Sequence, residues 1–104
     1  MSLNDAIKDN DILQVKLLLA DARIDVTKAN NEGMTPFYSA CYRGHINIVK
    51  LLLENSDQID VNKPNKSNET PLDVAYMNKH NEIVKLLLAN DRIIIDSNKE
   101  YILS

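Results

Sequence analysis

The sequence predicts an all-α solenoid of helix-turn-helix repeats joined by short β-hairpin loops. Nearly the same six residues recur at Gln14–Leu19, Ile48–Leu53 and Ile83–Leu88, at offsets of 34 and 35. A fixed period in this range is typical of repeat arrays, in which each unit is too small to bury its own apolar face and packs against its neighbours. The low content of Gly, Pro and aromatic residues also suits helices better than a turn-rich β fold.

The first unit is expected over residues 1–29. Leu3 and Ala6 stand one period before Phe37 and Ala40, so the first helix is expected to begin close to residue 3 without a Thr-Pro start. Polar residues fill this helix and the turn after it, which predicts an N-terminal capping unit with a solvated outer face. They are Asn4, Asp5, Lys8, Asp9, Asn10 and Asp11.

The second unit, residues 30–64, carries the clearest helix signals. Thr35 can cap a helix through its hydroxyl, and Pro36 takes the first helical position, where a missing N–H costs nothing. Gly44 is expected to end this helix in a left-handed conformation. A second helix should begin near Ile46, and its apolar residues cover more than half of its circumference. It is therefore predicted to pack between helices on both sides.

The third unit, residues 65–99, repeats these signals with two changes. An Asn- and Ser-rich stretch predicts an extended loop or hairpin that leads to a second Thr-Pro start at Thr70. Asp73 stands at the third helical position, where it can reach back to the capping residue. Lys79 stands where the second unit has Gly44, so we expect a left-handed strain of about 1 kcal/mol and a looser turn.

The end of the sequence, residues 92–104, permits two interpretations. The apolar stretches Ile93–Ile95 and Tyr101–Leu103 can pair as a small terminal hairpin, or the segment can begin a further unit of a truncated array. The hairpin is slightly favoured. Either arrangement exposes apolar residues and predicts a tendency to self-associate.

Composition narrows the classes of partner and compartment. The net charge is −3, from 12 basic and 15 acidic residues, and no basic stripe is present, so neither nucleic acid nor a membrane surface is an expected partner. Cys41 is the single cysteine, which rules out an intrachain disulfide. The first residues do not resemble a signal peptide, and no apolar run approaches the length of about 20 that a membrane span needs. A cytoplasmic location is expected, with the nucleus left open.

Several motifs in the same register resemble the ankyrin repeat. They are Gly33–Cys41, Gly44 with His45, Ile48–Leu53 and Ile59–Asn62, and the resemblance extends over essentially the whole chain. It implies an ankyrin-type solenoid that binds other proteins through a concave face, made of loop tips and the outer side of each first helix. The family's Thr-Pro-Leu-His tetrapeptide has Tyr38 and Asp73 in place of His, so the family's imidazole link to the neighbouring loop is altered here.

The resemblance implies a protein-binding surface of twelve residues. Tyr42, Arg43 and Met77 stand out, because Tyr and Arg are over-represented at binding hot spots and Met adapts to irregular partners. For each of these residues alone, a local structural role is about equally well supported. The full set is Lys8, Asp9, Asn31, Glu32, Met34, Tyr42, Arg43, Lys66, Ser67, Glu69, Met77 and Asn78.

No catalytic, cofactor or metal site is expected. Cys41 and His45 are four residues apart, but Cys41 stands where the family has a buried alanine and His45 is the family's recurring structural His. His45 and His80 are equivalent in successive units, without further residues at ligand spacing. The resemblance makes Asn62 a candidate for asparaginyl hydroxylation, although a turn Asn that bonds its local backbone is the better supported role.

These observations predict a small, monomeric protein-binding module that acts as an adaptor or scaffold, without enzymatic activity. Two alternatives stay open: a regulatory inhibitor or chaperone-like subunit of an enzyme assembly, and a structural element that self-associates through its C-terminal segment. The sequence does not identify the partner.

Overall fold

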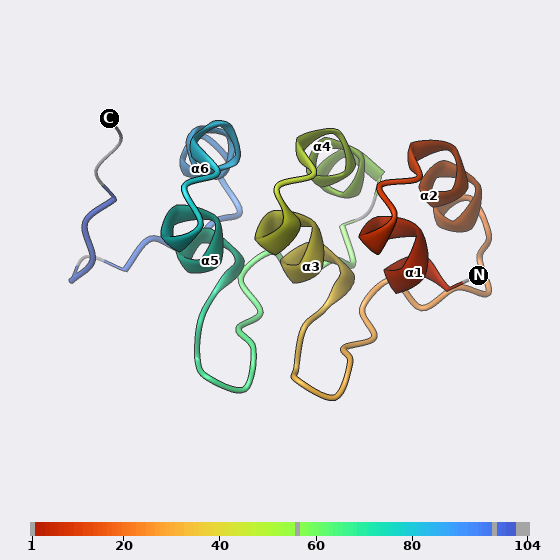
Figure 1. The fold of residues 1–104 in the computed structure, drawn as a ribbon, viewed down its shortest axis with the longest axis horizontal. Helices are drawn as coiled ribbons and strands as arrows, with labels where there is room; N and C mark the ends of the chain where they lie inside the picture. Colours follow the sequence, from red (N-terminus) through yellow and green to blue (C-terminus); the bar gives the residue numbers. More distant parts are fainter. Residues whose placement is uncertain (1, 56, 97, 102–104) are drawn as a thin grey trace.

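Six helices form two rows in the part of the chain that the computed structural model describes, residues 2–55, 57–96 and 98–101 (Figure 1). The molecule measures 38 × 24 × 23 Å, and the units follow one another along its longest axis. The first helix of each unit lies in one row and the second helix in the other, which confirms the predicted all-α solenoid. The helices are α1 Leu3–Lys8, α2 Ile12–Leu19, α3 Pro36–Arg43, α4 Ile46–Asn55, α5 Pro71–Met77 and α6 Asn81–Leu88.

Side-chain caps begin the first helix of every unit. The Tyr38 N–H donates to Thr35 Oγ1 at 3.1 Å. Thr70 and Asp73 form the predicted capping box, with two reciprocal bonds of 3.1 Å. The first unit has no Thr-Pro, and Ser2 caps α1 instead. A helix can therefore start so near the beginning of the sequence because its exposed N–H groups still find a partner.

The turn between the two helices of each unit passes through a left-handed residue. The φ angles are 54° at Asn10, 77° at Gly44 and 62° at Lys79, so the left-handed conformation predicted for Lys79 is confirmed. Gly44 has a second reason to be glycine: a Cβ atom there would lie 2.7 Å from Cε1 of His80. The same position is filled by other residues in the first and third units.

The second helices carry the most deeply buried apolar side chains. Val49 and Leu52 have no exposed surface, because α4 packs between α2 and α6. In α2 only Val15 is buried. Leu13 and Leu17 are 68% and 58% exposed, since no described helix covers that side of α2. The uncovered side of α2 is therefore apolar, and that the first unit is an N-terminal cap stays a prediction.

The loops between units are hairpin-shaped turns, and none of the described residues forms a strand (Figure 1). In each loop an asparagine side chain accepts backbone hydrogen bonds across the turn. Asn30 Oδ1 accepts from the N–H groups of Glu32 and Met34, and Asn65 Oδ1 accepts in the same way from residues 67 and 69. Each loop is thus closed by one amide oxygen together with one backbone bond, from Asn30 N–H to Met34 or from Asn65 N–H to Glu69, and the expected strands do not form.

The described residues of the C-terminal segment, 92–96 and 98–101, contact the second and third units. Ile93 is buried, and the Ile94 N–H donates to Asn62 Oδ1 at 2.8 Å. The Tyr101 ring packs edge-on against Tyr76, with centroids 5.2 Å apart. Residues 102 and 103 of the expected hairpin lie outside the described residues, and Ile93–Ile95 does not form the expected strand. The Ile93 N–H bonds the nearby Asn90 carbonyl, and the Ile94 N–H reaches the loop of the second unit.

Candidate functional site

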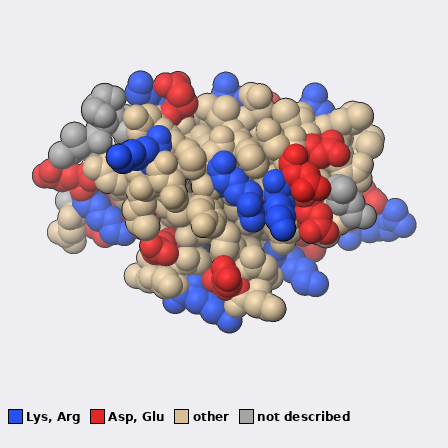
Figure 2. Space-filling view, in the orientation of Figure 1, with Lys and Arg blue, Asp and Glu red and all other residues tan. Residues whose placement is uncertain are grey.

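Equivalent residues of the first helices form two exposed rows along the stack. Their period is that of the repeat, so each position is copied from α1 to α3 to α5. Figure 2 shows basic side chains over and beside α3 and acidic side chains over α1 on this face. The first row is Lys8, Tyr42 and Met77, and the second is Asp9, Arg43 and Asn78; all six are exposed, as predicted.

A hollow of about 430 Å³ lies between α1, α3 and the loop before α3. Its walls mix amide, carboxylate, basic and phenol groups, which can each bond a peptide backbone or a polar side chain. Six predicted residues line it together: Lys8, Asn31, Glu32, Met34, Tyr42 and Arg43.

Met34 does not lie on the surface as predicted. Only 6% of it is exposed, and the rest packs in the core. The loop that begins at Asn30 explains this position, because Asn30 bonds both the N–H and the carbonyl of Met34 and turns its side chain inward. Met34 therefore contributes an edge to the hollow and cannot be a protruding contact.

A second hollow, of about 370 Å³, lies between α5 and the C-terminal segment. It contains Glu69 and Met77 of the predicted set, and Met77 is 58% exposed. Lys66, Ser67 and Asn78 are exposed but line neither hollow, and the same holds for Asp9. The residues that line the second hollow are Asn68, Glu69, Asp73, Tyr76, Met77, Lys99, Glu100 and Tyr101.

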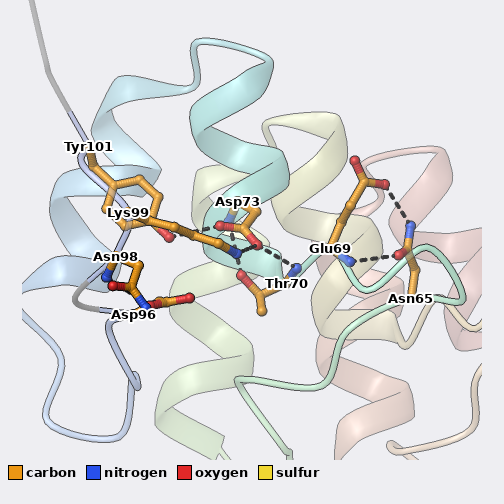
Figure 3. A network of polar contacts seen from close by, with 8 residues as sticks. All are labelled: Asn65, Glu69, Thr70, Asp73, Asp96, Asn98, Lys99 and Tyr101. Atoms are coloured by element: carbon orange, nitrogen blue, oxygen red, sulfur yellow. Dashed lines mark hydrogen bonds and ion pairs between the residues drawn. The ribbon is translucent and has the colours of Figure 1, made fainter.

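Asp73 is the centre of a polar network that closes this end of the stack (Figure 3). Its carboxylate accepts from Lys99 Nζ and from the Tyr101 hydroxyl, each at 2.7 Å, and from the Thr70 N–H at 3.1 Å. Burial of Asp73 raises the pKa of its carboxyl, but the hydrogen bonds from Lys99, Tyr101 and Thr70 outweigh burial and hold this pKa below its usual value. The C-terminal segment is thereby tied to α5.

Lys99 and Tyr101 are neighbours of Asp73 that were not expected from the sequence, although the repeat period offers a signal for Lys99. Lys99 follows Asn65 by 34 residues, and Asn65 Nδ2 donates to the Tyr38 hydroxyl at 2.9 Å. Asn65 and Lys99, one period apart, thus bond Tyr38 and Asp73, which each follow a Thr-Pro-Phe or Thr-Pro-Leu sequence. No comparable pattern marks Tyr101.

The two histidines join neighbouring units. His80 Nε2 lies 2.9 Å from the Tyr42 carbonyl, and His45 bonds the Lys8 backbone in the same way. Burial lowers the pKa of His45, while its bond to Lys8 acts in the opposite direction. Among the described residues, no group of three potential metal ligands is found. The equivalence of the two rings supports the structural role that the sequence suggested.

Cys41 is fully buried, and this burial raises the pKa of its thiol. A buried, protonated thiol is a poor nucleophile. Cys41 therefore occupies a buried core position, as expected from the sequence.

Asn62 differs from the expected local turn. Its Nδ2 donates to the Arg92 carbonyl and its Oδ1 accepts from the Ile94 N–H, both at 2.8 Å. These partners are about one repeat away, so the side chain links successive loops. Hydroxylation of Asn62 stays a prediction.

The model of the family described as ankyrin repeats, in three copies, matches residues 3–99. The chain belongs to the ankyrin-repeat family. In this ankyrin-repeat chain, the two polar links described above stand where the family's tetrapeptide His would link to the next loop. They are Tyr38 with Asn65, and Asp73 with Lys99.

Three curated relatives are similar over part of this ankyrin-repeat chain. A probable serine/threonine-protein kinase of Dictyostelium discoideum is 36% identical over 52 residues, which are 50% of this chain and 5% of that protein. The serine/threonine-protein kinase TNNI3K of Mus musculus and that of Rattus norvegicus are each 42% identical over 41 residues, which are 39% of this chain and 5% of each relative. The chain therefore corresponds to a small fraction of these kinases.

Ankyrin repeats are generally protein–protein interaction modules, and the repeat fold itself is not catalytic. In the described ranges, every helix is too short or too polar to cross a bilayer.

Proposed function

We propose that this ankyrin-repeat protein binds a protein partner through the face formed by α1, α3 and the loop between residues 30 and 34. The observation that carries the proposal is the shared hollow. A single concavity is lined by residues of α1, α3 and the loop before α3, which lie far apart in the sequence. Tyr42, 44% exposed, and Arg43 stand at its edge and supply the aromatic and cationic groups that most often dominate binding energy.

The double variant Tyr42→Ala/Arg43→Ala tests this assignment. Both side chains are exposed, so the helical circular dichroism and the unfolding midpoint should stay close to those of the native protein. Capture of the partner from the native source should fall at least about tenfold, as expected when hot-spot side chains are removed.

The matched control is Asn47→Ala/Lys50→Ala, which changes two exposed residues of α4. It should capture the partner as the native protein does. If both double variants capture the same amount of partner, the binding surface lies elsewhere on the molecule.

The effect on the partner distinguishes an adaptor from a regulatory subunit. If the captured protein is an enzyme, titration of this chain into its assay will change the rate in a regulatory complex and leave it unchanged in a scaffold. The similarity to segments of kinases motivates a kinase assay first.

Self-association is a second candidate, favoured by apolar residues near the C-terminal end. Ile94 is 76% exposed and Ile95 is 50% exposed. Exposed branched side chains in an extended segment favour pairing between copies. Light scattering should then show a mass that rises with concentration, and Ile94→Lys/Ile95→Lys should abolish the rise; a constant monomer mass removes this candidate.

A further inference from the structure

The aromatic rings of Tyr76 and Tyr101 form one wall of the second hollow, and two contacts hold the Tyr101 ring in place. Tyr101 stands edge-on to Tyr76 and is held in place by its hydroxyl bond to Asp73. Met77 is 58% exposed and borders the same concavity. An aromatic ring that is already ordered loses little freedom when a ligand packs on it, so such a wall favours binding.

The charges around this wall are mainly negative. Glu69, Asp73 and Glu100 line the hollow together with a single cation, Lys99. The Lys99 ammonium is 2.7 Å from Asp73, so this pair neutralises itself and the other two carboxylates set the sign of the local field. Glu69 is held at the rim because its Oε1 accepts from Asn65 Nδ2 at 3.1 Å (Figure 3).

Aromatic faces and carboxylates attract the same kind of ligand. A cation over a tyrosine ring is stabilised by the ring quadrupole, and a planar guanidinium can also bond a carboxylate with two N–H groups. An ammonium offers only a compact charge, without a flat face to lie on a ring. The complementary side chain is therefore arginine.

We propose that the hollow between α5 and residues 98–101 is a binding site for an arginine side chain of a partner protein. The site extends the partner surface of the proposed function by one unit and rests on that function for its biological use. The guanidinium lies against Tyr76 and Tyr101 and bonds Glu69 or Glu100, while the aliphatic part of the side chain contacts Met77.

Small probes test the site without knowledge of the partner. N-acetyl-arginine methylamide, titrated into ¹⁵N-labelled protein, should shift the backbone amide signals of Tyr76, Met77 and Tyr101 with saturation in the low millimolar range, as expected of a single side chain. The citrulline analogue has the same shape but no charge, and its affinity should be at least about fivefold lower. The norleucine analogue should bind no better than citrulline.

Variants locate the charge that attracts the probe. Glu69→Gln/Glu100→Gln should weaken binding of the arginine probe about fivefold, the loss expected for exposed ion pairs, while glutamine keeps the bond that Glu69 accepts from Asn65. Glu82→Gln, on α6, removes one exposed carboxylate outside the hollow and should leave the affinity unchanged.

Several results would overturn the proposal. These are equal affinity of the arginine and citrulline probes, an equal loss in the Glu82→Gln control, or no shift of the three signals at about 20 mM probe. Failure of the proposed function has a different signature: unchanged partner capture by Tyr42→Ala/Arg43→Ala, together with normal probe binding, would reject the first hollow and leave the arginine site standing.

Discussion

At the scale of single residues, one position of the repeat shows how neighbours decide which residue is tolerated. Asn10, Gly44 and Lys79 all have positive φ, and at Gly44 an added Cβ would also lie 2.7 Å from Cε1 of His80 in the following unit. The sequence allowed us to predict two of these three left-handed turns, because Gly before His marks the one at Gly44 and the period gives the one at Lys79. The contact with His80 was not predictable, since it depends on how two units approach each other.

Gly44→Ala should destabilise the protein by at least about 2 kcal/mol, because left-handed strain and the clash with the His80 ring act together. Lys79→Gly is the matched change at the same position of the next unit, and relief of its strain should stabilise the fold by up to about 1 kcal/mol. Urea unfolding of the two variants measures both effects. Two changes of equal size and sign would contradict this account of the turn.

Asp73 makes the stability of the C-terminal end dependent on pH. Its pKa in the folded protein lies below the ordinary value, so the ionised group stabilises the fold above the pKa of the unfolded chain, and this stabilisation is lost as pH falls through the folded-state pKa. Asp73→Asn should therefore cost about 1 to 3 kcal/mol near neutral pH, and less in acid. Unfolding midpoints between neutral pH and about pH 3 measure the difference.

The exposed Asp91→Asn is the control for the loss of one carboxylate, and its difference from the native protein should be small at neutral pH. A cost of Asp73→Asn that stays constant over the whole pH range would show that the carboxylate charge does not stabilise this end.

At the scale of the helices, the pattern of apolar residues correctly predicted that α4 packs between two neighbouring helices. Val49 and Leu52 of α4 are fully buried between α2 and α6. The same run of leucines in α2 leaves Leu17 exposed. The repeated sequence does not show which second helices have a neighbour on only one side. The period therefore predicts where the helices lie in the sequence, while the burial of their side chains depends on which helices are their neighbours.

Leu52→Ala and Leu17→Ala separate these two environments. Removal of the fully buried Leu52 side chain should cost about 2 to 5 kcal/mol, through lost burial and a cavity. Removal of the 58% exposed Leu17 side chain should cost less than about 0.5 kcal/mol. Chemical denaturation followed by circular dichroism measures both, and comparable costs would mean that Leu17 is covered in solution.

At the scale of the whole molecule, the stack aligns positions that lie about one repeat apart into a common face. The face, with Tyr42 and Arg43 on it, was predictable from the family resemblance. The second hollow was not, because it forms only when Tyr101 folds back on Tyr76, and no repeat pattern marks that return. Contacts of a segment that does not follow the repeat, such as that of Tyr101, can be found only in the structure.

The same geometry gives the two hollows different chemistry. Amide and mixed charged groups surround the hollow near Tyr42, while aromatic rings and carboxylates surround the hollow near Met77. A partner segment that contacts both must present polar groups at one end and a basic side chain at the other. Such a gradient along one face favours a single orientation of the partner.

Hydrogen exchange of the isolated protein and of its complex with the captured partner tests the central claim most directly. Backbone amides of the loop at residues 30–34 and of the ends of α3 and α5 should exchange more slowly in the complex, while the exposed outer residues of α4, among them Asn47 and Lys50, should exchange as before. Protection confined to α4 and α6, with the loop and α3 unchanged, would contradict a partner surface on the inner helices.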